Sequence, residues 1–102
     1  DFLALHGLML LFDTLRTLNK ALPAPIRYRA FATMYDRRAK ACTRVLEMLT
    51  RKLGPAMFET IISMDTRFRE ASALGKVIYD IDPHCKGARG YTALAEEVAA
   101  LW

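Results

Sequence analysis

The chain has 102 residues, of which 53% are hydrophobic and 25% are charged, and its formal net charge is +4. This composition is that of one small folded domain and excludes a disordered segment. The longest apolar run, residues 8–12, is far shorter than the roughly 18 to 20 residues that a membrane-spanning helix needs. Because the chain begins with Asp1 and no signal-peptide pattern follows, we expect it to be part of a longer protein.

Cysteine spacing and charge distribution restrict the classes of site. Cys42 and Cys85 lie far apart and outside any CxxC motif, so they predict neither a zinc site nor a disulfide framework, and a reducing cytosol is expected. Basic residues are concentrated in residues 27–44, whereas acids outnumber them from residue 80 onward. Such a basic segment attracts a polyanion unless it is only a solvated helix face.

The first half of the chain predicts two helices and two strands. Apolar residues at spacings of three and four predict an amphipathic helix over residues 2–22, which a Pro-rich turn ends. The alternating pattern of residues 28–35 (YRAFATMY) predicts a strand. A second helix is predicted over residues 42–53, before the Gly-Pro pair at 54–55, and residues 57–62 (MFETII) predict a second strand.

The second half predicts a short helix over residues 66–74, a brief strand over 77–79 and a terminal helix over 88–101. On the terminal helix, Glu96 and Glu97 are expected to face solvent. Strands that alternate with helices predict a mostly parallel sheet covered by helices, in one α/β domain. A sheet of two or three strands has exposed edges that require a neighbour.

Residues that could carry catalysis are scattered along the chain. Neither His6 nor His84 has a second ligand or a nucleophile at a useful spacing. The glycines form no GxxxxGK[ST] loop, and no serine stands in a GxSxG motif. We therefore assign no catalytic or metal-binding residue, and we expect this chain alone not to hydrolyse a nucleotide.

Arginines follow both predicted strands. Arg37 and Arg38 come directly after the first strand, and Arg67 and Arg69 lie in the loop after the second. Because neighbouring parallel strands end at the same edge of a sheet, these guanidinium groups are expected at one edge, where they suit phosphate oxygens. The alternative is that they form ordinary surface ion pairs with the nearby acids Asp36, Asp65 and Glu70.

Four segments resemble the C-terminal half of the ParA/Soj chromosome- and plasmid-partition ATPases, a deviant-Walker P-loop group that includes MinD. They are TMYDRR (33–38), FETII (58–62), RFREASALGKVIYDIDP (67–83) and KGARGYTALAEEV (86–98). The opening FLALHGLMLLFDTL also resembles the helix after the family's central strand. The resemblance covers essentially the whole chain in order.

The resemblance implies the C-terminal portion of a doubly wound, mostly parallel P-loop NTPase-like sheet flanked by helices, with residues 1–102 as its final third to half. The phosphate-binding loop and the magnesium-holding acids of the family then belong to a preceding portion. In the family, ATP drives dimerisation, the homodimer binds DNA without sequence preference, and a ParB-type partner stimulates hydrolysis. The resemblance thus implies a cytoplasmic, nucleoid-associated bacterial ATPase that uses ATP and Mg and segregates chromosome or plasmid DNA.

Four site residues follow from the resemblance. Arg38 closes the strand-end motif and Arg67 lies in the loop after the next strand, and similar proteins use both positions to bind the DNA backbone. Nonspecific DNA binding needs phosphate contacts of this kind. In related proteins the TMYD strand end lies near the nucleotide base, which places Met34 and Asp36 at the rim of the nucleotide site.

The chain departs from the family pattern at two places. Residues 61–65 read IISMD where many relatives read IIPRN, so a basic residue is lost, an acid is gained and the local positive charge is weakened. Cys85 replaces the usual helix-capping serine and is a poorer cap.

Two other interpretations remain open. In the first, the chain is a stand-alone, non-catalytic binding or structural module. In the second, it is part of a MinD-like positioning ATPase that acts at membranes. The MinD-like class usually ends in a basic amphipathic helix, whereas this chain ends in AEEVAALW. That ending favours DNA over a membrane as partner.

Overall fold

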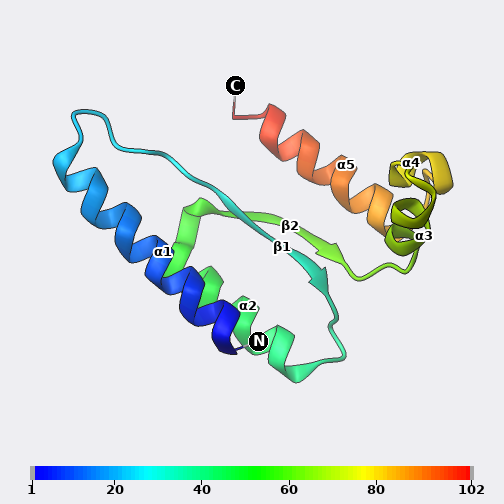
Figure 1. The fold of residues 1–102 in the computed structure, drawn as a ribbon, viewed down its shortest axis with the longest axis horizontal. Helices are drawn as coiled ribbons and strands as arrows, with labels where there is room; N and C mark the ends of the chain where they lie inside the picture. Colours follow the sequence, from blue (N-terminus) through cyan, green and yellow to red (C-terminus); the bar gives the residue numbers. More distant parts are fainter. Residues whose placement is uncertain (1, 102) are drawn as a thin grey trace.

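The computed structural model describes residues 2–101. Helix α1 (Phe2–Ala21) leads through an extended segment to strand β1 (Ala30–Tyr35). Helix α2 (Lys40–Leu53) leads through the 3-10 turn η1 (Gly54–Ala56) to strand β2 (Met57–Ser63) (Figure 1). These elements confirm the order predicted for the first half, although β1 begins later than expected because the residues after α1 remain extended without a strand partner.

After β2, the regular elements of the described residues are all helices. Helix α3 (Arg67–Leu74) and the terminal helix α5 (Lys86–Ala99) confirm two predictions. The brief strand predicted over residues 77–79 is wrong, because a short helix, α4 (Ile78–Ile81), forms there instead. The turn closes with the Asp82 N–H donating to the Ile78 carbonyl at 3.0 Å. It buries the Ile78 side chain against the first turn of α5, whereas a strand here would have no neighbour to pair with.

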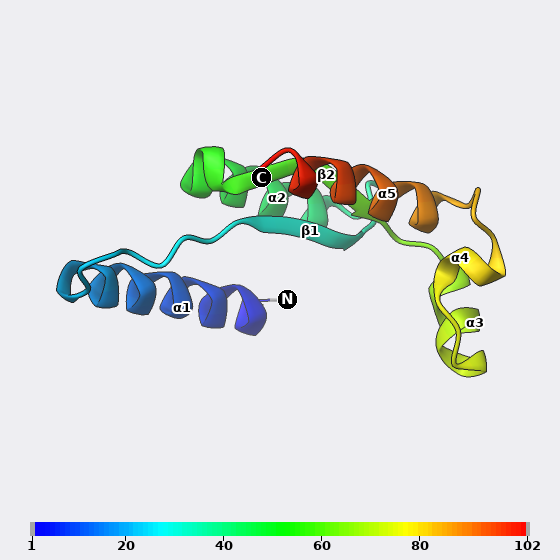
Figure 2. The same cartoon turned by 90° about the horizontal axis from the view of Figure 1, so that it is seen from above.

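The two strands pair in parallel, with a helix on each face, which confirms the predicted α/β architecture. Ala30 pairs with Met57 and Ala32 with Ile61, so β2 bulges by two residues between these pairs. Figures 1 and 2 show α2 and α5 beside the strands. Ile61 shares a cavity wall with α2, whereas the next residue, Ile62, contacts α5, so the two helices cover opposite faces.

The most deeply buried part of the molecule lies between β2 and α5. The Ile62 side chain is fully buried, and Leu94 of α5 is also buried. Gly90 allows this close approach, because a Cβ atom there would lie 3.1 Å from Ile62 Cδ1. This packing fixes α5 relative to the carboxyl end of β2.

The sequence predicted that Glu97 faces solvent, but in the structure its side chain contacts β2. Its carboxylate reaches from α5 to the bulge of β2, where it accepts hydrogen bonds from the N–H groups of Glu59 at 3.1 Å and Thr60 at 2.6 Å. It also accepts a hydrogen bond from the Thr60 hydroxyl group. These hydrogen bonds, that of the Thr60 hydroxyl foremost, lower the pKa of Glu97. The bulge exposes backbone donors that need an acceptor, and Glu97 supplies it.

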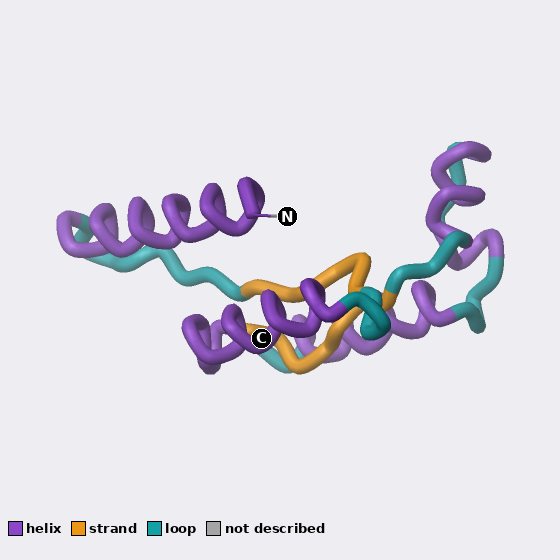
Figure 3. Tube along the Cα trace, turned by 90° about the horizontal axis from the view of Figure 1, so that it is seen from below, coloured by secondary structure: helices purple, strands orange, loops and turns teal. Residues whose placement is uncertain are grey.

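Helix α1 makes few contacts with the rest of the chain. Figures 2 and 3 show it apart from α5, joined to β1 by an extended connection. Phe12 is its buried anchor and stacks on Tyr28 with ring centroids 5.4 Å apart. About half of each side chain is exposed at Leu10, Leu11 and Leu18. Within residues 2–101, no helix is long and apolar enough to cross a membrane.

Candidate nucleic-acid interface

The loops that carry the predicted site residues lie at one edge of the sheet. The Met64 N–H donates to the Tyr35 carbonyl at 2.9 Å, which joins the carboxyl ends of β1 and β2. Arg38 follows β1 in the first loop, and Arg67 begins α3 after the second loop. The prediction that both loops emerge at the same edge is therefore confirmed.

Arg38 forms an ion pair with Asp36, as the alternative interpretation expected. Arg38 Nε lies 3.1 Å from Asp36 Oδ1, and Nη2 lies 3.3 Å from Oδ2. Hydrogen bonds from Arg38 lower the pKa of Asp36. The Arg38 side chain is 85% exposed, and exposed pairs of this kind are weak. An anionic ligand can therefore compete with Asp36 for the guanidinium group.

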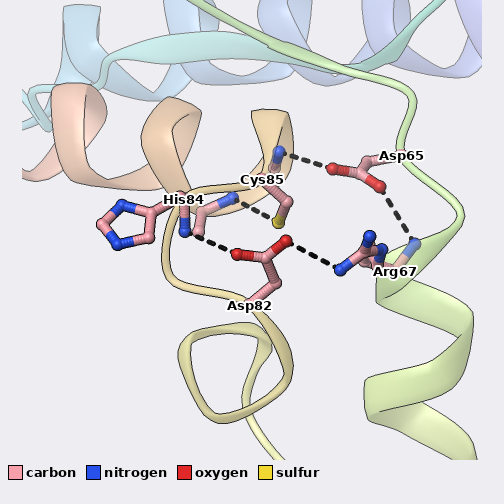
Figure 4. Close-up of polar contacts among 7 residues, drawn as sticks. Asp65, Arg67, Asp82, His84 and Cys85 are labelled. Atoms are coloured by element: carbon pink, nitrogen blue, oxygen red, sulfur yellow. Dashed lines mark hydrogen bonds and ion pairs between the residues drawn. The ribbon is translucent and has the colours of Figure 1, made fainter.

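Arg67 pairs with an acid that the sequence did not indicate. Its Nη1 atom lies 2.7 Å from Asp82 Oδ2, rather than near Asp65 or Glu70 (Figure 4). The other Asp82 oxygen accepts a hydrogen bond from the His84 N–H at 2.9 Å, so the carboxylate is held at both ends. The Arg67 side chain is 42% exposed. Its remaining N–H groups are available for a phosphate, because a guanidinium group carries five donors.

Asp65 connects the starts of two helices. One carboxylate oxygen accepts a hydrogen bond from the Arg67 N–H of α3 at 3.0 Å, and the other accepts from the Gly87 N–H of α5 at 2.8 Å (Figure 4). These backbone hydrogen bonds, Arg67 first, lower the pKa of Asp65. The acid gained in the IISMD segment thus has a structural role. Its position just before a predicted helix was the signal for a cap, but its second partner was not visible in the sequence.

Cys85 is the N-cap residue of α5, and its Sγ atom accepts a hydrogen bond from the Ala88 N–H at 3.5 Å. This long contact agrees with the expectation of a poor cap, and Asp65 supplies the stronger acceptor. At Gly87, a Cβ atom would lie 2.5 Å from Phe68 Cζ and 2.7 Å from Ile78 Cδ1. A side chain at this position would therefore require the Phe68 and Ile78 side chains to shift, because the first turn of α5 packs closely on α3 and α4.

Met34 and Asp36, the predicted nucleotide-rim residues, lie in different surroundings. Met34 has a left-handed backbone with φ 55°, and its side chain is 67% exposed. Such a conformation at a non-glycine residue costs on the order of 1 kcal/mol and is typical of functional sites. Met34 lines a cavity of about 410 Å³ together with Phe68, Arg69 and Tyr91. Asp36 is not among the residues that line this cavity, and its carboxylate contacts Arg38.

The carboxylates at this edge do not form an Mg²⁺ site. Within residues 2–101, no three His, Cys, Asp or Glu side chains converge as metal ligands. The three carboxylates of this edge are already engaged, by Arg38, Arg67 and backbone N–H groups. The edge supplies guanidinium groups for anions rather than carboxylates for a metal.

Comparison with known proteins agrees with the resemblance seen in the residues. No family model matches the chain. Over 98% of its length it is 36% identical to the chromosome-partitioning ATPase Soj of Treponema pallidum and 34% identical to the sporulation initiation inhibitor protein Soj of Bacillus subtilis. It is 35% identical to the chromosome-partitioning ATPase Soj of Thermus thermophilus over the same share. The chain spans about 40% of the length of these relatives.

Proposed function

We propose that this chain, which is homologous to Soj-type chromosome-partitioning ATPases, is the C-terminal part of a ParA-like partition ATPase. The observation that carries the proposal is the match of 98% of the chain, at 36% identity, to a chromosome-partitioning ATPase. The parallel strand pair flanked by helices, with arginines after both strands, supports the same assignment.

In this proposal the intact protein is a cytoplasmic, nucleoid-associated homodimer that binds ATP and Mg²⁺, binds DNA without sequence preference and responds to a ParB-like partner. The Mg²⁺ and phosphate ligands of the intact protein belong, in this proposal, to the portion of the protein that carries the phosphate-binding loop. Met34 and Asp36 contribute the rim near the nucleotide base. The exposure of Met34 beside a cavity supports that role for Met34.

Arg38 and Arg67 are the proposed DNA contacts of this edge. Each follows the carboxyl end of a strand, and each side chain is at least 42% exposed. Their ion pairs leave guanidinium N–H groups available to DNA phosphates. Such contacts contribute affinity without reading base sequence.

The test is DNA binding by the intact protein with ATP after Arg38→Ala or Arg67→Ala. Each substitution is expected to weaken binding to all duplex sequences and to reduce the salt slope of log K by about 1, because one phosphate contact is lost. Nucleotide binding is expected to stay nearly unchanged.

Arg16→Ala is the matched control, because Arg16 also forms an exposed ion pair, 3.9 Å from Asp13, but lies on α1. It is expected to leave DNA affinity unchanged. If both site variants also bind DNA with unchanged affinity, the assignment of Arg38 and Arg67 is wrong.

A further inference from the structure

Helix α2 carries four exposed cations, which we call the α2 basic face. All four side chains are exposed, and among residues 2–101 none of the four forms an ion pair. Glu47 is the one acid of the helix, so α2 has a net charge of +3. The face consists of Lys40, Arg44, Arg51 and Lys52.

The helical period places three of the four cations on one side, and Lys52 lies at the margin of the face, about 100° from the other three. Lys40, Arg44 and Arg51 lie four and seven residues apart, so they fall within about 40° of one line and extend over about 16 Å of the helix. Val45, Leu46 and Leu49 occupy the opposite side and are half-buried against β1. The packing of α2 on the sheet therefore directs the basic face away from the strands.

The two predicted DNA contacts differ from this face because each is paired with an acidic side chain. Arg38 is paired with Asp36 and Arg67 with Asp82, so the acids offset both positive charges.

Glu47 lies on the same line, three residues after Arg44 and four before Arg51, and offsets part of the charge of the α2 basic face, but among residues 2–101 it forms no ion pair with these cations. Helix α2 also begins two residues after Arg38, so the face continues directly from the proposed DNA-contact loop. The exposed cations of α2 therefore extend the accessible positive charge of this region, to which Arg37 and Arg69 also contribute.

We infer that the α2 basic face is an electrostatic contact of this chain with duplex DNA, and this inference rests on the function proposed above. DNA carries one negative charge per about 1.7 Å of its axis, so a line of about 16 Å faces roughly ten phosphate charges. The face presents long basic side chains and no amide that could read bases, which suits sequence-independent binding.

A duplex fits this face better than an anionic membrane does. Helices that insert into a lipid surface place large apolar side chains beside their basic ones. Among the cations of this face the one large apolar residue is Met48, which lies in a shallow depression with Arg44, Arg51 and Lys52. The other large apolar side chains of α2, among them Val45, Leu46 and Leu49, face the sheet and are not available to lipid.

The experiment measures binding of the intact protein, with ATP and Mg²⁺, to a random-sequence DNA duplex as salt is varied. Arg44→Gln/Arg51→Gln is expected to reduce the salt slope of log K by about 2, because two phosphate contacts are lost. Arg44→Glu/Arg51→Glu is expected to weaken binding at low salt by at least about tenfold. Arg16→Glu/Lys20→Glu on α1 makes the same change in net charge and is expected to leave affinity within about twofold of the unmodified protein.

Nucleotide affinity and circular dichroism check that the variants are folded. If the unmodified protein binds the duplex and the α2 variants bind with the same affinity and salt slope, the inference is wrong while the proposed function stands. If the unmodified protein does not bind the duplex at all, the proposed function and the inference are both wrong. Loss of binding to phosphatidylglycerol vesicles with unchanged DNA affinity would assign the face to a membrane and overturn the inference.

Discussion

Asp65 is the residue on which the geometry of the strand-end edge most depends. Its carboxylate accepts hydrogen bonds from the N–H groups of Arg67 in α3 and Gly87 in α5, and Gly87 lies 22 residues from Asp65 in the sequence. Because Arg67 is one of those donors, Asp65 fixes the backbone of a proposed DNA contact. The acid that lowers the local positive charge therefore also positions the arginine.

Replacing Asp65 by Ala is expected to lower the free energy of unfolding by about 0.5–2 kcal/mol, the range measured for lost helix caps. The substitution leaves two helix-start N–H groups without their acceptor. Asp80→Ala is the control, because Asp80 is an exposed acid of α4. Urea unfolding of both variants measures the difference. Equal loss of stability in the two variants would contradict the claim that Asp65 caps the starts of α3 and α5.

The stability of the protein should also depend on pH through Asp65. Its pKa is lowered in the folded protein, so its contribution is fully present above the unfolded pKa of about 3.9 and is lost as the pH falls through the folded value. Asp65→Asn should therefore show a smaller fall in stability than the unmodified protein below about pH 4. Identical pH profiles of unfolding in the two proteins would contradict a lowered pKa of Asp65 in the folded protein.

At the scale of elements, Glu97 links α5 to the bulge of β2. Glu97→Ala is expected to expose the Glu59 and Thr60 N–H groups and to speed their hydrogen exchange roughly tenfold, because their acceptor is lost. Glu96→Ala is the control, since Glu96 is the exposed neighbour on the same helix. Unchanged exchange at Thr60 in the Glu97 variant would show that the contact does not protect the strand.

The sequence predicted the elements better than the contacts between them. Hydrophobic periods are local, so α1, α2, α5 and both strands appeared within a few residues of their predicted bounds. Residues 77–79 failed because a three-residue apolar segment has no distinct period, and burial of Ile78 decided its conformation. The partners of Arg67 and Glu97 lie 15 and 37 residues away, and no local pattern reports contacts at such separations.

At the scale of the whole molecule, much apolar surface lies outside any core. Leucines on the outer side of α1 are about half-exposed, and the sheet has only two strands with open edges. Exposed apolar faces and strand edges mark surfaces that associate with further protein. This surface favours the chain as part of a larger sheet over a stand-alone module.

The 102-residue chain on its own is therefore expected to self-associate. Light scattering at increasing protein concentration measures this association. Leu11→Lys/Leu18→Lys should lower the apparent mass, because both leucines lie on one exposed side of α1. A monomer at high concentration in the unmodified chain would contradict the expectation.

The central claim is that this chain is the C-terminal part of a partition ATPase, and the sequence of the coding DNA upstream of Asp1 tests it most directly. Because the chain spans about 40% of its relatives, the reading frame is expected to continue upstream and to encode a strand followed by a KGGxGKT-type loop. A start codon immediately upstream of Asp1 would contradict the claim, since the protein would then lack a phosphate-binding loop.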